Sequence, residues 1–174
     1  LTSTGAGSPP AFEAVPAGGI THAGIYRVHT GFGTGGEINP VVNWEKDDSF
    51  GPGFLGADMS ESSGVFTFPA TGMWRVDFHS TFYYDTLTTY VGAVILNTTD
   101  NSTYNTNAIA ESYIMGSNGN LYSSVSTHTM LDISSVSNCK VKFMIYNTGS
   151  ISVNIKGSAD QNLTYAIFTR LGDT

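Results

Sequence analysis

The 174-residue chain has little charge, one cysteine and no long hydrophobic run. Its 7 lysines and arginines stand against 14 aspartates and glutamates. The formal net charge of −7 argues against nucleic acid and anionic lipid as partners, since neutralising phosphates needs clustered cations. Cys139 alone permits no internal disulfide, which favours synthesis in a reducing cytosol. No apolar run approaches the roughly 18 residues that span a bilayer, so we expect no membrane insertion.

Motifs for enzymatic chemistry are also missing. The sequence has no GxSxG elbow, no GxxxxGK[ST] loop and no GxGxxG followed by a helix. Its four histidines are far apart, and none has the spacing of a zinc site. We therefore expect a protein that is not an enzyme, with no catalytic residue, no metal and no cofactor.

Carboxylates are densest at Glu45, Asp47 and Asp48, followed by Asp58 and Glu61. Oxygen-rich loops bind calcium, and paired carboxylates hydrolyse glycosides. A solvated loop is the plainer interpretation, because a two-carboxylate mechanism needs a shaped cleft. Calcium binding stays open as an alternative.

What the chain does have is Gly, Ser, Thr and Asn in abundance, with aromatic residues at 12% and charged residues also at 12%. A surface weak in charge and rich in Tyr and Phe is suited to association. We expect the chain to associate with itself.

Two regions differ in composition. Residues 1–19 combine small residues with Pro9, Pro10 and Pro16 and show no apolar period, which predicts a linker or attachment arm. Residues 20–174 alternate short apolar segments with turn residues, which predicts one antiparallel β domain.

The clearest strand covers residues 73–83, where Trp74, Val76 and Phe78 alternate with polar side chains. The strands that we predict are 24–32, 41–46, 65–68, 73–83, 90–96, 108–114, 121–133, 140–146, 151–156 and 164–171. About ten strands are typical of a jelly roll of two sheets. Turn residues at 69–72 and 147–150 predict hairpins.

Residues 64–78, GVFTFPATGMWRVDF, resemble the signature of the complement globular-head family, within the tumour-necrosis-factor-like (TNF-like) jelly-roll superfamily. The positions that carry the resemblance are Gly64, Phe66, Gly72, Trp74, Val76 and Phe78. Apolar packing independently places Phe66, Trp74, Val76 and Phe78 in the core. The resemblance implies an all-β, TNF-like jelly-roll sandwich over about residues 20–172. It also implies a compact homotrimer on a stalk, which binds partners through loops or grooves between subunits.

The opening LTSTGAGSP and the ending RLGDT resemble bacteriophage fibre and appendage proteins. This second resemblance implies a virion protein that is made in the host cytoplasm. The arm would then contact other virion proteins.

Tyrosines gather around a predicted turn. Tyr83, Tyr84 and Tyr90 are our candidate ligand-binding residues, because tyrosine-rich loops stack on sugars or anchor protein partners. The alternative is that these rings pack a trimer interface or a core edge.

The function that we predict is the trimeric tip of a phage fibre or appendage, which recognises a host surface glycan or protein. The first alternative is a capsid decoration (cement) protein, which would bind empty capsids and not cells. A further alternative is a secreted cytokine-like or lectin-like ligand.

Overall fold

The computed structural model describes residues 19–34, 36–51, 53–84, 90–113, 121–147 and 153–174. Most of the predicted arm therefore lies outside the described residues. Within them the chain is all-β, and no helix could cross a membrane. The strands are β1 (His22–Val28), β2 (Phe32–Thr34), β3 (Trp44–Lys46), β4 (Ser60–Ser62), β5 (Val65–Thr67), β6 (Gly72–Tyr84), β7 (Tyr90–Thr98), β8 (Asn105–Tyr113), β9 (Leu121–Ile133), β10 (Lys140–Asn147), β11 (Val153–Ile155) and β12 (Tyr165–Gly172).

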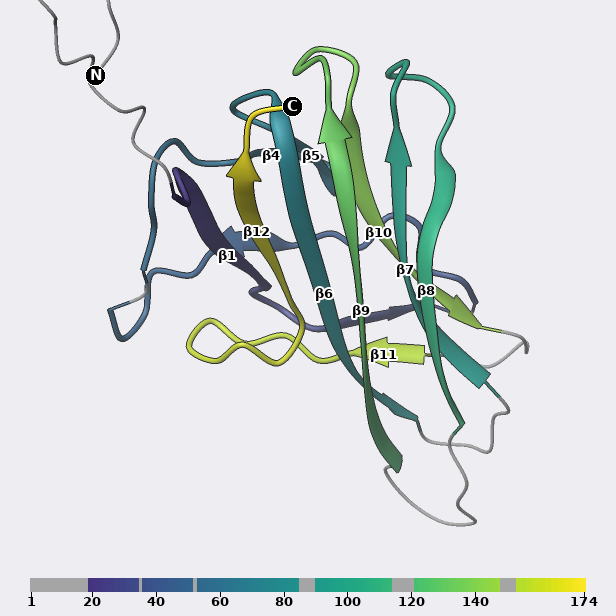
Figure 1. Cartoon of the computed structure of the whole chain (residues 1–174). Coiled ribbons are helices and arrows are strands. Elements are labelled where there is room, and N and C mark those ends of the chain that lie inside the picture. Colours follow the sequence, from purple (N-terminus) through teal and green to yellow (C-terminus); the bar gives the residue numbers. More distant parts are fainter. Residues whose placement is uncertain (1–18, 35, 52, 85–89, 114–120, 148–152) are drawn as a thin grey trace, which may run out of the picture.

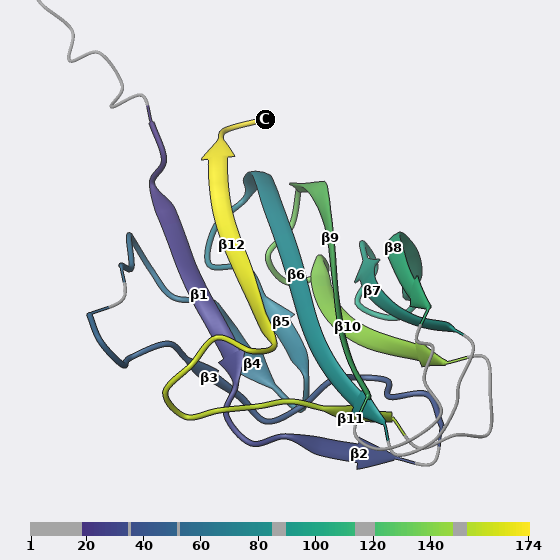
Figure 2. The same ribbon diagram turned by 90° about the horizontal axis from the view of Figure 1, so that it is seen from below.

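The strands form two antiparallel sheets that pack face to face (Figures 1 and 2). The 7-stranded sheet runs β2-β11-β6-β12-β1-β3. Both β11 and β12 pair with β6, at residues 82–83 and 73–79 respectively. Strand β9 also pairs with β6, over residues 72–84. The 5-stranded sheet runs β4-β5-β10-β7-β8. The all-β jelly roll that the sequence predicts is confirmed.

Strand alternation decides which side chains face the interior. In β6, Trp74, Val76 and Phe78 are 1%, 0% and 0% exposed, whereas Arg75 is exposed on the opposite face. Phe66 of β5 is also 0% exposed. Every second side chain of a strand points to the same face, so these strands contribute one apolar face each to the core.

The core is built around aromatic rings. Phe78 and Phe143 have ring centroids 4.6 Å apart, and Phe66 lies 5.0 Å from Phe168. The indole of Trp44 lies 5.3 Å from both Phe66 and Phe143, and its Nε1 donates to the Val41 carbonyl. The interior thus joins rings from β3, β5, β6, β10 and β12.

Strand boundaries before residue 70 differ from the prediction. The predicted strand 24–32 is two strands, β1 and β2, because the chain turns away after Val28. There, the His29 amide donates to Asn43 and the Ser158 amide donates to the Val28 carbonyl. The predicted strand 41–46 shortens to β3, and the prediction missed β4, which is short and polar.

Neither predicted hairpin joins neighbours within one sheet. The segment 69–72 leads from β5 in the 5-stranded sheet to β6 in the 7-stranded sheet. Similarly, β10 and β11 belong to different sheets, and residues 148–150 between them lie outside the described residues. Turn residues mark a change of direction but not the sheet that the next strand joins.

Gly72 has φ +120°, and a Cβ there would collide with the Gly172 carbonyl.

Candidate interaction surfaces

The sandwich has two distinct ends. At the end that we call proximal, β1 begins and β12 ends: His22 pairs with Arg170, and Gly72 lies against Gly172. At the opposite, distal end, β6 ends and β9 begins, where Tyr84 pairs with Leu121. Figure 1 shows the start of β1 beside the C-terminus, far from the end of β6. Whatever is attached before β1 therefore joins the proximal end.

On the 7-stranded sheet, the distal end carries Tyr83 and its cross-strand partner Tyr122. Their ring centroids lie 6.0 Å apart, and Tyr122 is 56% exposed. The ammonium of Lys156 lies 4.8 Å from the centroid of the Tyr122 ring. The sheet therefore presents two adjacent rings and a cation to solvent.

On the 5-stranded sheet, the same end carries Tyr90 and Tyr113, which are also cross-strand partners. Their centroids lie 5.5 Å apart, and the two residues are 48% and 54% exposed. A 2.6 Å hydrogen bond between Ser112 and Ser123 links β8 to β9 beside Tyr113. This bond holds the distal edges of the two sheets together.

The three candidate tyrosines thus do not form one site. Tyr83 and Tyr90 lie on different sheets, each beside a partner from a later strand. Tyr84 belongs to β6, and its side chain lies outside the described residues. The sequence shows tyrosines at 113 and 122, but strand pairing is the only signal that matches each with its partner.

Farther from the distal end, the outer face of the 7-stranded sheet has a hollow of about 260 Å³. Its side chains come from β6, β9 and β12, with the imidazole of His79 at its wall. Nδ1 of His79 lies 2.7 Å from the Ser126 hydroxyl, and the ring stacks on Tyr165 at a centroid distance of 5.0 Å. Burial lowers the pKa of His79 below its ordinary value of 6.5.

The charges beside this hollow neutralise each other. The guanidinium of Arg75 binds both carboxylate oxygens of Asp77, with contacts of 2.7 to 3.1 Å. Ile167 also lines the hollow, and Met130, the cross-strand partner of Arg75, is 66% exposed. This face therefore combines apolar side chains with paired charges.

The dense carboxylates surround a buried arginine. Arg27 is 1% exposed, and its guanidinium contacts Glu45 at 2.7 Å, Asp47 at 2.6 Å and Asp48 at 3.2 Å. Asn162 donates to the second oxygen of Asp47. These carboxylates serve as counter-ions that fix the loop after β3. Within the described residues, no group of three or more His, Cys, Asp or Glu side chains is placed to hold a metal ion.

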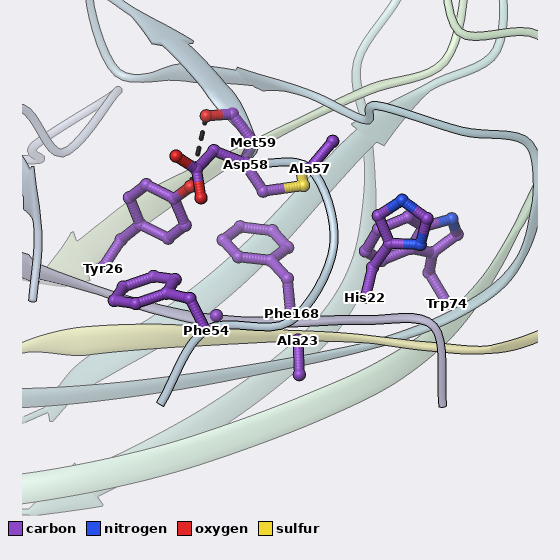
Figure 3. Close-up of a pocket in the computed structure, with 10 residues that line it drawn as sticks. His22, Ala23, Tyr26, Phe54, Ala57, Asp58, Met59, Trp74 and Phe168 are labelled. Atoms are coloured by element: carbon purple, nitrogen blue, oxygen red, sulfur yellow. Dashed lines mark hydrogen bonds between the residues drawn. The ribbon is translucent and has the colours of Figure 1, made fainter. Parts of the chain in front are cut away.

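A second, smaller pocket lies between β1 and the segment before β4 (Figure 3). Phe54 packs against Gly24 and lies edge-on to Tyr26, whose hydroxyl donates to the Met59 carbonyl. Burial raises the pKa of Tyr26 to about 12. The free space is about 10 Å³, close to the volume that one water needs. This pocket is a packing defect and not a ligand site.

Comparison with known proteins identifies the fold but no close relative. The sequence matches no protein-family model and no curated protein. The structure is similar to Eiger TNF from S. frugiperda, with a TM-score of 0.62 and 13% identity over 87% of this chain and 93% of that one. Murine APRIL at pH 5.0 gives a TM-score of 0.55 and 14% identity over 86% and 99% of the two chains. At pH 8.5 its TM-score is 0.52.

The fold is therefore the TNF-like jelly roll, the class that the signature at residues 64–78 predicts. Identities this low relate the folds and leave function to the surfaces described above.

Proposed function

We propose that the chain is a binding head that forms a homotrimer, is tethered at its proximal end, and contacts its target with its distal end. In the finer form of this proposal, the head is the tip of a phage fibre or appendage and its target is a host surface glycan or protein. The arm at residues 1–19 then connects the head to other virion proteins.

One observation supports this proposal above the others: the polarity of the sandwich. The start of β1 and the C-terminus lie at one end, and the pairs Tyr83–Tyr122 and Tyr90–Tyr113 lie at the other. A tether at the proximal end leaves the distal end free to meet a target. Tyrosine combines a large apolar area with a hydroxyl at low entropic cost, which suits it to recognition.

Self-association is proposed through the proximal part of the outer face of the 7-stranded sheet, which leaves the distal part free. Met130 is 66% exposed there, and Arg75 and Asp77 neutralise each other. Burial of such a face removes apolar area from water without leaving the Arg75 charge unpaired. Three copies also raise the effective concentration of weak distal contacts.

A secreted cytokine-like ligand is the second candidate. The fold comparison favours it, since the similar structures are a TNF protein and APRIL. Both candidates share the trimeric head and differ in where the head acts. A capsid decoration protein, the third candidate, uses the arm and the trimer base instead of the distal end.

Binding assays separate these candidates. Fluorescently labelled head is incubated with candidate host cells, with animal cells and with empty capsids. The fibre tip binds host cells, and Tyr113→Ala or Tyr122→Ala lowers that binding. The control Val136→Ala, at an exposed proximal position after β9, does not lower it. Binding to capsids alone favours decoration, and binding to animal cells alone favours the cytokine-like ligand. Host-cell binding that both distal variants leave intact contradicts the proposal.

A further inference from the structure

The distal part of the 7-stranded sheet brings together side chains that the sequence separates. Asn154 of β11 pairs with Tyr83 of β6, which pairs with Tyr122 of β9. Val153 and Ile155, the neighbours of Asn154, are buried, so the amide of Asn154 shares the outer face with the two rings. The outer face therefore presents, side by side across β11, β6 and β9, the amide of Asn154 and the rings of Tyr83 and Tyr122.

The next row toward the proximal end adds hydroxyls and a cation. The backbone amide of Lys156 donates to the carbonyl of Thr81, and Thr81 pairs with Ser124 of β9. Each of these residues is separated by two positions from a member of the first row, so their side chains point to the same face. We call these six residues, Thr81, Tyr83, Tyr122, Ser124, Asn154 and Lys156, the distal patch.

Lys156 is available for an anion. Arg27, Lys46, Arg75 and Arg170 each have a carboxylate partner within the described residues. Lys156 has none there: its ammonium lies over the Tyr122 ring, 4.8 Å from the centroid. In a chain with a net charge of −7, a cation placed above exposed rings selects for a ligand with a negative charge.

We infer that the distal patch binds an acidic saccharide, a pyranose that carries a carboxylate. The C–H face of a pyranose packs on the Tyr83 and Tyr122 rings, and its carboxylate accepts hydrogen bonds from the Lys156 ammonium. The Asn154 amide and the Thr81 and Ser124 hydroxyls supply donors and acceptors for the sugar hydroxyls. This inference rests on the proposed function, for which it names the ligand class.

The test uses a matched pair of probes, polymers that display glucuronic acid or glucose on the same backbone. Binding to residues 1–174 is measured by surface plasmon resonance. We expect the acidic probe to bind at least about tenfold more tightly than the neutral one, since 1.4 kcal/mol in binding free energy is a factor of ten. Equal binding of the two probes, or no binding of either, overturns the inference.

Two variants with matched controls assign the effect to the patch. Lys156→Gln removes the preference for the acidic probe, whereas Lys142→Gln, which also takes a lysine from above a tyrosine ring, leaves the preference intact. Tyr122→Ala weakens the binding of both probes, whereas Tyr104→Ala, which removes the ring beneath Lys142, changes the binding of neither. Equal losses from the two lysine variants, or from the two tyrosine variants, contradict the site. Thermal unfolding of each variant shows that it is folded.

The inference and the proposed function fail in distinguishable ways. A trimer that binds host cells but no acidic saccharide supports the proposed function and overturns the inferred ligand class. A head that binds acidic saccharide, but neither host cells nor animal cells, supports the inferred site and contradicts the fibre-tip function.

Discussion

The aromatic side chains of the interior and those of the distal end belong to the same sandwich but have opposite environments. Phe78 and Phe143, with centroids 4.6 Å apart, are both 0% exposed. Tyr90 and Tyr113, at 5.5 Å, are 48% and 54% exposed. The first pair excludes water from the core and contributes to the free energy of folding. The second pair keeps much of its surface in water, and we propose that it contacts the target.

The sharpest way to test this comparison is to truncate one ring of each kind. Phe78→Ala removes a fully buried ring and should lower the free energy of unfolding by about 4 kcal/mol, through lost burial and an unfilled cavity. Tyr113→Ala should change it by less than about 0.5 kcal/mol. Urea denaturation measures both values. Equal losses in the two variants would contradict the division between core and binding surface.

The same contrast holds for the arginines. Arg27→Ala leaves Asp47, which is 6% exposed, without its buried counter-ion, so we expect a loss of about 3 kcal/mol in unfolding free energy. Arg75→Ala removes a largely exposed ion pair and should lower the free energy of unfolding far less. Chemical denaturation at low ionic strength compares them. An Arg27 variant as stable as the Arg75 variant would show that the buried network does not hold the loop.

The two outer faces are compared by placing a charge on each. Met130→Glu puts a carboxylate on the proposed subunit interface and should lower the association constant at least about tenfold. Ile109→Glu, on the 5-stranded sheet and 49% exposed, should leave association unchanged. Sedimentation velocity over a concentration series measures both. Dissociation caused by Ile109→Glu alone would move the interface to the other face.

The smallest expected effect is a pH dependence from His79. Burial lowers its pKa below 6.5, so the folded chain binds fewer protons than the unfolded chain at slightly acidic pH. The stabilisation from neutral His79 is complete above pH 6.5 and is lost as the pH falls through the lowered pKa. His79→Gln should reduce the loss of stability between pH 7.5 and 5, whereas His128→Gln on the same face should not. Denaturation midpoints that respond equally to both variants would count against this assignment.

Much of the fold follows from local sequence. Alternation in residues 73–83 predicts which side chains of β6 face the core, and the spacing of the signature at residues 64–78 indicates the jelly roll. The sheet that each strand joins is a long-range property, which is why both predicted hairpins are wrong. Short polar β4 lacks an apolar period and gives no local signal of a strand.

The candidate site was predictable only in part. The cluster Tyr83, Tyr84 and Tyr90 is visible in the sequence, but Tyr83 and Tyr90 belong to different surfaces. The neighbours that give Tyr83 a chemical context are Tyr122 and Asn154, which are brought beside it by antiparallel pairing. Pairing depends on the register of whole strands, which no short segment of sequence specifies.

The central claim is that the proximal part of the outer face of the 7-stranded sheet joins three copies into one head. Light scattering of residues 1–174 tests this claim most directly. The account predicts a solution mass close to three times the 18.5 kDa of one chain, and a mass of one chain for Met130→Glu at low concentration. A wild-type chain that stays monomeric at micromolar concentration would contradict it.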